Sequence, residues 1–235
     1  MGSEGRASAG GVRSVWLRSR RTSRSGEPPL TRERIVEAAV ALLDEEGIER
    51  LTMRRLAERL AIVAPSLYWH VETKDDVIDL AVDAIFGEVP PVAGEPSHWR
   101  EDACAVLSVW RAALLRHPWA AAVPARRRPT IGPHFLAGME ALQATLVRAG
   151  FTGKGLSAAT WALYNHVMGS AASETALHIT PEERRLGQEQ LQGNRDRYPT
   201  LAARGYLYDD DWDGSFATGL DYLLDGLQAQ LDRAR

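Results

Sequence analysis

Residues 51–74 of the chain, LTMRRLAERLAIVAPSLYWHVETK, have the pattern of two short helices joined by a tight turn. Charged side chains lie on one side of the first helix. Its other side is made of three leucines: Leu51, Leu56 and Leu60. Residues 62–63 interrupt the helical spacing, and Pro65 fits best in the first turn of a second helix.

The second helix, residues 64–71, is too short to be stable without tertiary packing. Leu67 and Val71 are four residues apart and supply its inward face. The other large or polar side chains point mostly outward: Ser66, Tyr68, Trp69 and His70. This arrangement is typical of a helix-turn-helix that binds DNA. A Tyr-Trp-His run also fits the core or rim of an ordinary helix pair, so the pattern alone leaves both interpretations open.

Three motifs between Thr31 and Glu88 carry a family resemblance. They are RERIVEAAVALLDEEG, GIERLTMRRLAERL, and LYWHV followed by Lys74. Together they resemble the DNA-binding domain of the tetracycline-repressor (TetR) family of bacterial regulators, and the LYWHV–Lys pair is most similar to the tetracycline repressors themselves. The resemblance implies an all-α regulator that binds double-stranded operator DNA.

The bulk composition restricts where nucleic acid can bind. The chain has 235 residues, 45% of them hydrophobic, and a formal net charge of −3, so any DNA contact surface is local. The single cysteine, Cys104, excludes an internal disulfide. The sequence has no apolar run long enough for a bilayer and no signal-peptide core at its start, which predicts a cytoplasmic protein that does not contact the membrane.

The first part of the chain divides into an arm and a small domain. Residues 1–30 are rich in Gly, Ser and Arg and predict a disordered basic arm, which either adds phosphate or minor-groove contacts or is an unselected tail. Residues 31–88 form the predicted DNA-binding domain. In it Thr31 caps a first helix that stops at Gly47, and Thr73 caps a last helix that runs from Lys74 to about Glu88.

After the boundary segment VPPVAGEP, residues 95–235 form the predicted ligand-binding and dimerisation domain. Helical spacing predicts helices over residues 99–117, 133–149, 152–178 and 215–231. Residues 179–199 are polar and predict a mobile loop, although residues 181–191 could hold a few helical turns. Alternating strand patterns are missing from the sequence, so the predicted fold is all-α.

The resemblance assigns roles to individual residues of the helix-turn-helix. Arg54 matches an arginine that reads guanine, and a bidentate guanidinium–guanine pair is the commonest specific base contact. Pro65 and Tyr68 match residues that pack on thymine methyls. Ala64 stands where the tetracycline repressors have a glutamine that reads adenine, so the resemblance implies a different operator. The residues that match DNA-backbone contacts are Thr52, Ser66, Trp69, His70 and Lys74.

So small a DNA-binding domain predicts a homodimer on a palindromic operator. The dimer candidates are the helices over residues 155–178 and 215–231, which the resemblance implies pair across the dimer as a four-helix bundle. Ordinary internal core is the alternative for both. The last helix carries a wide apolar stripe: Phe216, Leu220, Leu223, Leu224, Leu227 and Leu231.

The remaining helices predict a pocket for a small-molecule effector. Its candidate lining residues are mostly apolar: Trp110, Arg128, Pro129, His134, Met139, Trp161, Asn165 and Met168. The tetracycline-binding residues of the family are not preserved. The position of the metal-ligating histidine is taken by Pro124, and the other replacements are Pro90, Val106 and Glu140. The expected effector is therefore an organic molecule other than magnesium-bound tetracycline, with no cofactor and no metal site.

Two other function classes remain as alternatives. An all-α enzyme finds little support, because the six histidines show no metal-ligand spacing and no glycine-rich phosphate loop is present. A ligand-independent architectural DNA-binding protein does not explain the large second domain or its lack of positive charge.

Overall fold

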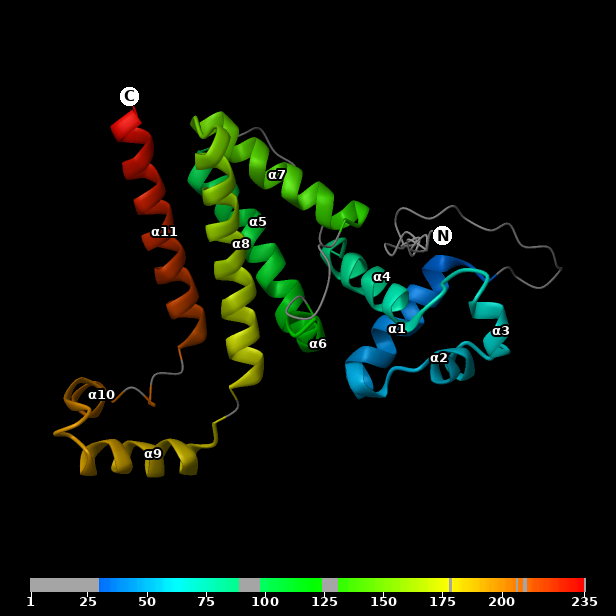
Figure 1. Cartoon of the computed structure of the whole chain (residues 1–235), viewed down its shortest axis with the longest axis horizontal. Coiled ribbons are helices and arrows are strands. Elements are labelled where there is room, and N and C mark those ends of the chain that lie inside the picture. The colour runs from blue at the N-terminus through cyan, green and yellow to red at the C-terminus, as the bar shows by residue number, and fades with distance from the viewer. Residues whose placement is uncertain are drawn as a thin grey trace, which may run out of the picture. The chain divides into compact units, whose positions relative to one another are not determined.

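The computed structural model describes residues 30–88, 98–123, 131–177, 179–205, 207–208 and 211–234. Every regular element in these ranges is a helix, which confirms the all-α prediction (Figure 1). Residues 1–29 of the predicted arm and the segment 89–96 lie outside the described residues, as do Arg128 and Pro129. None of the described helices is both long enough and apolar enough to cross a membrane.

By its internal contacts the chain forms two compact units. Unit 1 comprises Met1–Pro90 together with Val123–Met139, and unit 2 comprises Pro91–Ala122 together with Glu140–Arg235. The helix α7 (Pro133–Ala149) therefore begins in unit 1 and ends in unit 2.

In unit 1 the predicted helices are present. α1 (Arg32–Glu46) starts at Thr31, whose hydroxyl accepts the Arg34 N–H at 3.2 Å, and it ends at Gly47. α4 (Lys74–Phe86) starts with a capping box in which Thr73 and Asp76 satisfy each other's backbone N–H groups. α1 packs against α4 through fully buried side chains such as Ile35, Leu43 and Ile78.

The helix-turn-helix lies between these two helices in the chain. It is preceded by the short 3₁₀ turn η2 (Ile48–Arg50) and consists of α2 (Met53–Arg59) and α3 (Ala64–Leu67). Ala61 in the connecting turn has a left-handed φ of 56°, a conformation that costs a side-chain-bearing residue about 1 kcal/mol. Leu56, Leu67 and Val71 are buried beneath the turn and hold it in place.

Unit 2 is built around α8 (Gly153–Ala176). α5 (Trp99–Arg116), the short α6 (Pro118–Ala121) and α11 (Trp212–Ala234) all pack against it. The core of this packing includes Leu107, Leu163 and Val167. α9 (Pro181–Gly193) and α10 (Pro199–Arg204) pack against each other and follow α8 in the chain.

The structure corrects the sequence prediction at four places. The second helix of the helix-turn-helix, predicted over residues 64–71, is α3 over Ala64–Leu67 only, and residues 68–70 form a turn. The mobile-loop prediction for residues 179–199 is wrong, and the alternative of helical turns over residues 181–191 is confirmed, because α9 covers residues 181–193 and begins with a Thr180–Glu183 capping box. The sequence prediction does not include α6 and α10, each of which starts at a proline, a residue that the first turn of a helix tolerates. The last helix begins at Trp212, three residues before its predicted start.

Candidate DNA-binding and effector sites

The N-terminal half of the candidate DNA-binding surface is organised by the cap of α2. The hydroxyl of Thr52 accepts the Arg55 N–H at 3.2 Å, which orients the first turn of the helix. The Arg54 side chain projects from that turn and is 81% exposed, and its guanidinium lies 3.5 Å from the exposed Glu58 carboxylate. An exposed pair of this kind is weak, so the Arg54 guanidinium is available to a base edge.

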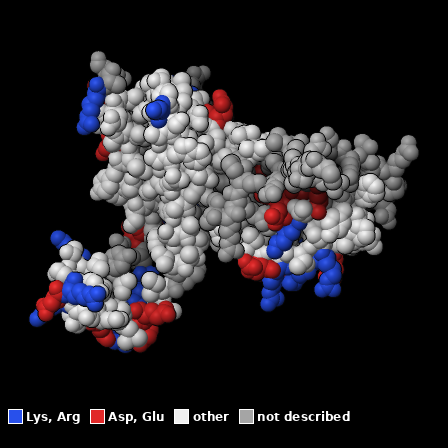
Figure 2. Space-filling model, viewed as in Figure 1, with Lys and Arg blue, Asp and Glu red and all other residues white. Residues whose placement is uncertain are grey.

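Two arginines on the other side of α2 attach it to α1. Arg59 makes a bidentate pair with Glu45, at 2.6 Å for each nitrogen–oxygen contact, and Arg55 pairs with Glu46. The hydrogen bonds from Arg59 lower the pKa of the Glu45 carboxyl. Figure 2 shows Lys and Arg side chains gathered over α1 and α2 with acidic side chains among them. The positive charge is local, as the composition requires.

The segment 64–71, of which α3 covers only Ala64–Leu67, buries and exposes its side chains largely as predicted. Leu67 and Val71 are buried, while Tyr68 and Trp69 are exposed, the latter by 58%. Ser66 and His70 are half-buried, so their outward orientation is only partial. Val63, directly before α3, is 68% exposed, whereas the sequence pattern assigns it only to the interruption between the two helices.

His70 and Lys74 are both held by contacts within unit 1. The Arg32 guanidinium donates to the His70 carbonyl at 3.3 Å, and burial together with the charge of Arg32 lowers the pKa of the His70 imidazole. The Lys74 ammonium donates to the Ile48 carbonyl at 2.9 Å. An ammonium has three donors, so this bond positions Lys74 and still leaves it able to contact a phosphate.

The C-terminal end of α4 is bonded to the first turn of α7 by Asp83. This carboxylate is buried and accepts the Phe135 N–H at 2.9 Å and the His134 N–H at 3.3 Å. Burial raises the pKa of the Asp83 carboxyl, and the two hydrogen bonds act in the opposite direction. A Cβ on Gly132 would lie 2.1 Å from Asp83 Oδ1, so only glycine allows this close approach.

Aromatic rings near Asp83 also join the end of α4 to the first turn of α7. Phe86 packs edge-on against Phe135 at 5.6 Å, and a Cβ on Gly87 would lie 2.5 Å from the His134 ring. His134, a candidate effector residue, thus lies exposed beside the end of α4.

Of the other candidate effector residues, Met139 lies on α7, Trp110 lies on α5, and Trp161, Asn165 and Met168 lie on α8. The buried Trp110 of α5 packs edge-on against Tyr164 at 6.1 Å, and Tyr164 packs edge-on against Trp161 at 5.4 Å. Trp161 and Asn165 are exposed on the outer face of α8, whereas Met139 and Met168 are half-buried. The structure therefore joins Trp110 and Trp161 through Tyr164, while Trp161 and Asn165 are themselves exposed. Among the described residues, no group of three or more His, Cys, Asp or Glu side chains is placed to hold a metal ion.

Comparisons with known proteins agree with this geometry. A family model described as "Bacterial regulatory proteins, tetR family" matches residues 35–81, and one described as "Tetracyclin repressor-like, C-terminal domain" matches residues 91–231. The chain belongs to the TetR family of transcriptional regulators. This membership favours the helix-turn-helix over an ordinary helix pair for residues 51–74, and a regulator over an enzyme.

Individual relatives cover nearly the whole chain. An HTH-type transcriptional regulator of Saccharopolyspora erythraea is 45% identical over 94% of both chains. The HTH-type transcriptional repressor DrrR1 of Streptomyces coeruleorubidus is 34% identical over 94% of this chain and 86% of its own. The crystal structure of the TetR family protein ActR of Streptomyces coelicolor in complex with actinorhodin matches with a TM-score of 0.78 and 30% identity, over 89% of this chain and 100% of ActR.

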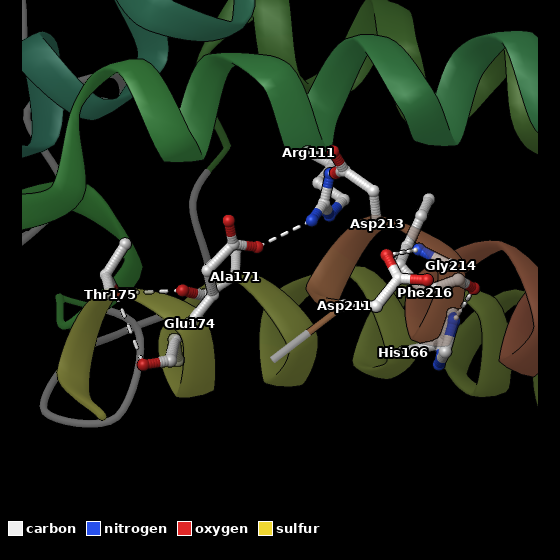
Figure 3. Close-up of polar contacts among 10 residues, drawn as sticks. Arg111, His166, Ala171, Glu174, Thr175, Asp211, Asp213, Gly214 and Phe216 are labelled. Carbon is white, nitrogen blue, oxygen red and sulfur yellow. Dashed lines mark hydrogen bonds and ion pairs between the residues drawn. The ribbon is translucent and has the colours of Figure 1, made fainter. Parts of the chain in front are cut away.

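A buried charge in unit 2 of this TetR-family chain also escaped the sequence analysis. Arg111 of α5 donates to Glu174 of α8 at 2.5 Å and to Asp213 of α11 at 2.6 Å, and its guanidinium lies 4.8 Å from the centre of the Phe216 ring (Figure 3). His166 stacks on Phe216 at 5.1 Å, with Nε2 2.9 Å from the Phe216 carbonyl oxygen. Arg111 therefore connects three helices. Its sequence signal was a charge inside the apolar stripe of α5, between Leu107 and Leu114.

Proposed function

We propose that this TetR-family chain is a ligand-responsive repressor that binds a palindromic operator as a homodimer and is released by a small organic effector. The observation that carries the DNA-binding part is the exposed Arg54 guanidinium beside the exposed Tyr68 and Trp69 on a helix-turn-helix. Arg54 would read a guanine, because its planar fork matches guanine O6 and N7. Thr52, Ser66, His70 and Lys74 would contact the DNA backbone.

Homodimer formation is supported by the outer faces of α8 and α11. Trp161, Asn165 and Gly169 are exposed at four-residue spacing on α8, and Tyr222 of α11 is 73% exposed. Figure 2 shows almost no charged side chains over these two helices in that view. Exposed apolar surface of this kind marks an interaction site, and a second copy pairing across a two-fold axis would cover it.

For the apolar stripe of α11, burial within the single chain favours the alternative of internal core. Phe216, Leu220, Leu224 and Leu231 are buried within the chain. They belong to the packing of α11 on α8, so the proposed dimer contact uses the opposite, exposed side of α11. Sedimentation velocity of the full chain tests this: a particle of twice the 25.9 kDa chain mass supports the dimer, and a monomer at micromolar concentration contradicts it.

An aromatic or apolar organic effector is supported by the side chains available for it. The half-buried Tyr164 ring lies against the rings of Trp110 and Trp161, and ActR, to which this chain is similar, has been crystallised with actinorhodin. The position of the metal-ligating histidine of the tetracycline repressors is Pro124 here, which argues against magnesium-bound tetracycline. No specific observation favours the ligand-independent architectural protein.

Release of DNA requires that the effector bind a DNA-incompetent conformation more tightly than the competent one. The contact of Asp83 with the first turn of α7 supplies a physical connection for this, since α7 continues into unit 2 and α4 begins directly after the helix-turn-helix. A shift of α7 would move α4. This movement would change the separation between the helix-turn-helix elements of the two copies in the proposed dimer. Operator half-sites are about 34–36 Å apart, so a change of a few ångströms prevents simultaneous docking.

The DNA-binding proposal is tested on duplexes selected by the protein from a random library. The Arg54→Ala substitution should weaken binding to the selected duplex by about 1–3 kcal/mol and remove the preference at one base pair per half-site. Lys74→Ala should weaken all sequences alike and reduce the salt slope by about one. Fluorescence anisotropy gives both quantities.

Arg185→Ala is the matched control, because it removes one half-exposed, ion-paired arginine from α9 of unit 2 and should leave DNA affinity unchanged. An unaltered base preference in Arg54→Ala would show that another residue reads the base pair. Failure of the wild-type chain to select any duplex would overturn the DNA-binding proposal itself.

A further inference from the structure

Val63 stands out among the apolar side chains of unit 1. Within the described part of that unit, the large hydrophobic residues that are exposed number four, and three of them lie within seven residues of each other: Val63, Tyr68 and Trp69, with Leu136 as the fourth. Val63 is the most exposed of these, at 68%. Its exposure is unrelated to the stability of the turn, because α3 is held by Leu67 and Val71 beneath it.

The backbone of Val63 fixes where its side chain points. Val63 is the N-cap of α3 with extended backbone angles, φ −80° and ψ 137°, and its carbonyl accepts the Ser66 N–H at 2.9 Å. The side chain therefore stands at the N-terminal end of the recognition helix. In helix-turn-helix proteins this end of the helix contacts the base edges in the major groove.

The chemistry of this end of the helix is almost wholly apolar. Val63, Ala64 and Pro65 follow one another, and none of their side chains carries a hydrogen-bond donor or acceptor. They cannot read the donor and acceptor pattern of a base pair. The apolar group that the major groove offers is the 5-methyl of thymine.

We infer that Val63 reads a thymine 5-methyl group in each operator half-site and thereby sets the base preference at that position. The inference rests on the proposed operator binding and names the chemistry that the operator must offer. Arg54 supplies the hydrogen-bonded contact of the half-site, and the segment Val63–Pro65 supplies the apolar one. The operator should accordingly carry thymines beside the guanine that Arg54 reads.

The size of the effect follows from the burial of one methyl group. Burying a methyl-sized group contributes about 0.8 kcal/mol, which is about a fourfold change in affinity. A palindromic operator has two half-sites, so losing both methyls should weaken binding by about 15-fold, the square of that factor.

The test replaces thymine by deoxyuridine, one position at a time, in a duplex selected by the wild-type chain. This substitution removes only the methyl group and keeps the base pairing. In each half-site, replacing one particular thymine should reduce the affinity of the wild-type chain about fourfold. Replacing thymines that Pro65 or Tyr68 contacts is a separate effect at other positions. Val63→Ala should bind the thymine duplex correspondingly more weakly and show no further loss when that thymine becomes deoxyuridine.

Val147→Ala is the matched control, since Val147 is a similarly exposed valine, 52%, on α7. It should keep both the wild-type affinity and the wild-type sensitivity to deoxyuridine. Val63→Ala leaves the Ser66–Val63 backbone hydrogen bond in place, and a thermal melt verifies that the variant is folded.

Two results would overturn the inference. One is that deoxyuridine is tolerated at every thymine, and the other is that Val63→Ala keeps the full wild-type sensitivity at every thymine. In both cases the chain still selects and binds a duplex, so the proposed function survives. If the chain binds no DNA at all, the proposed function has failed, and the inference with it.

Discussion

Asp83 in unit 1 and Arg111 in unit 2 are both buried charges that join helices far apart in the chain, yet they are satisfied in different ways. Asp83 accepts two backbone N–H groups at the start of α7, across 51 and 52 residues of sequence. Arg111 is held by two carboxylates and an aromatic ring, from residues 63 to 105 positions further along the chain. The first charge is stabilised by a helix terminus and the second by opposite charges.

The difference predicts different mechanical roles. A carboxylate at a helix terminus is held by two bonds to one short turn, so a small movement of α7 relative to α4 changes both bonds together. An arginine held by two other helices and a ring resists movement, because no single shift satisfies all three partners. Asp83 therefore suits a coupling contact, and Arg111 suits a fixed support for the helices that carry the proposed dimer face.

The largest effect is expected for Arg111→Met. This substitution keeps most of the side-chain volume but leaves Glu174, which is three-quarters buried, without its cation. Breaking a fully buried pair costs about 3–5 kcal/mol, and because Glu174 is partly exposed we expect a loss of about 2–3 kcal/mol in the free energy of unfolding.

Asp213→Ala is the control for that variant, since the Asp213 side chain is 86% exposed and its loss should cost less than about 1 kcal/mol. Urea unfolding measures both variants. Equal losses of unfolding free energy for Arg111→Met and Asp213→Ala would show that the buried Glu174 contact stabilises the fold no more than the exposed Asp213 contact does.

A smaller effect is expected for Asp83→Ala. It removes the acceptor for two N–H groups in the first turn of α7, which should cost about 1–2 kcal/mol. Hydrogen exchange should speed up at His134 and Phe135 in particular. Unchanged exchange at these two amides would mean that Asp83 does not stabilise the turn. The coupling role that distinguishes Asp83 from Arg111 would then be wrong.

The smallest effect concerns pH. Asp83 ionises near its ordinary pKa of 3.8 in the unfolded chain, and burial raises this pKa in the folded chain. Between the two values the folded state binds more protons, so its contribution to stability falls as pH rises through that window and stays lower above it. Asp83→Asn cannot ionise. The free energy of unfolding of wild type relative to Asp83→Asn should therefore decrease with rising pH from about 3.8 upward, and a difference that increases over this window contradicts the raised pKa.

Much of the fold was predictable because its signals are local. Thr31, Gly47 and Thr73 mark helix ends through hydrogen bonds to residues at most four positions away. The same holds for the Thr180–Glu183 capping box, which marks α9 but was not recognised within its polar surroundings. The short α6 and α10 have few residues with which to show a period, so spacing could not reveal them.

The two buried charges were visible as anomalies but could not be interpreted. Asp83 lies three residues after Leu80 on the apolar side of α4, and Arg111 lies between Leu107 and Leu114 on that of α5. Such a position says that a charge will be buried. It does not say what will neutralise it, because the partners come from segments that the helical period does not connect.

The sequence by itself determined the helix-turn-helix, its inward residues Leu67 and Val71, and the outward Arg54, since caps, periodicity and turn residues act within a few positions of the chain. Only the tertiary structure decided that Asp83 bonds to the first turn of α7, that Arg111 joins α5 to α8 and α11, and that Tyr164 contacts both Trp110 and Trp161. The physical reason is distance along the chain. A side chain's burial follows from the helix that carries it, whereas its partner follows from which helices pack together.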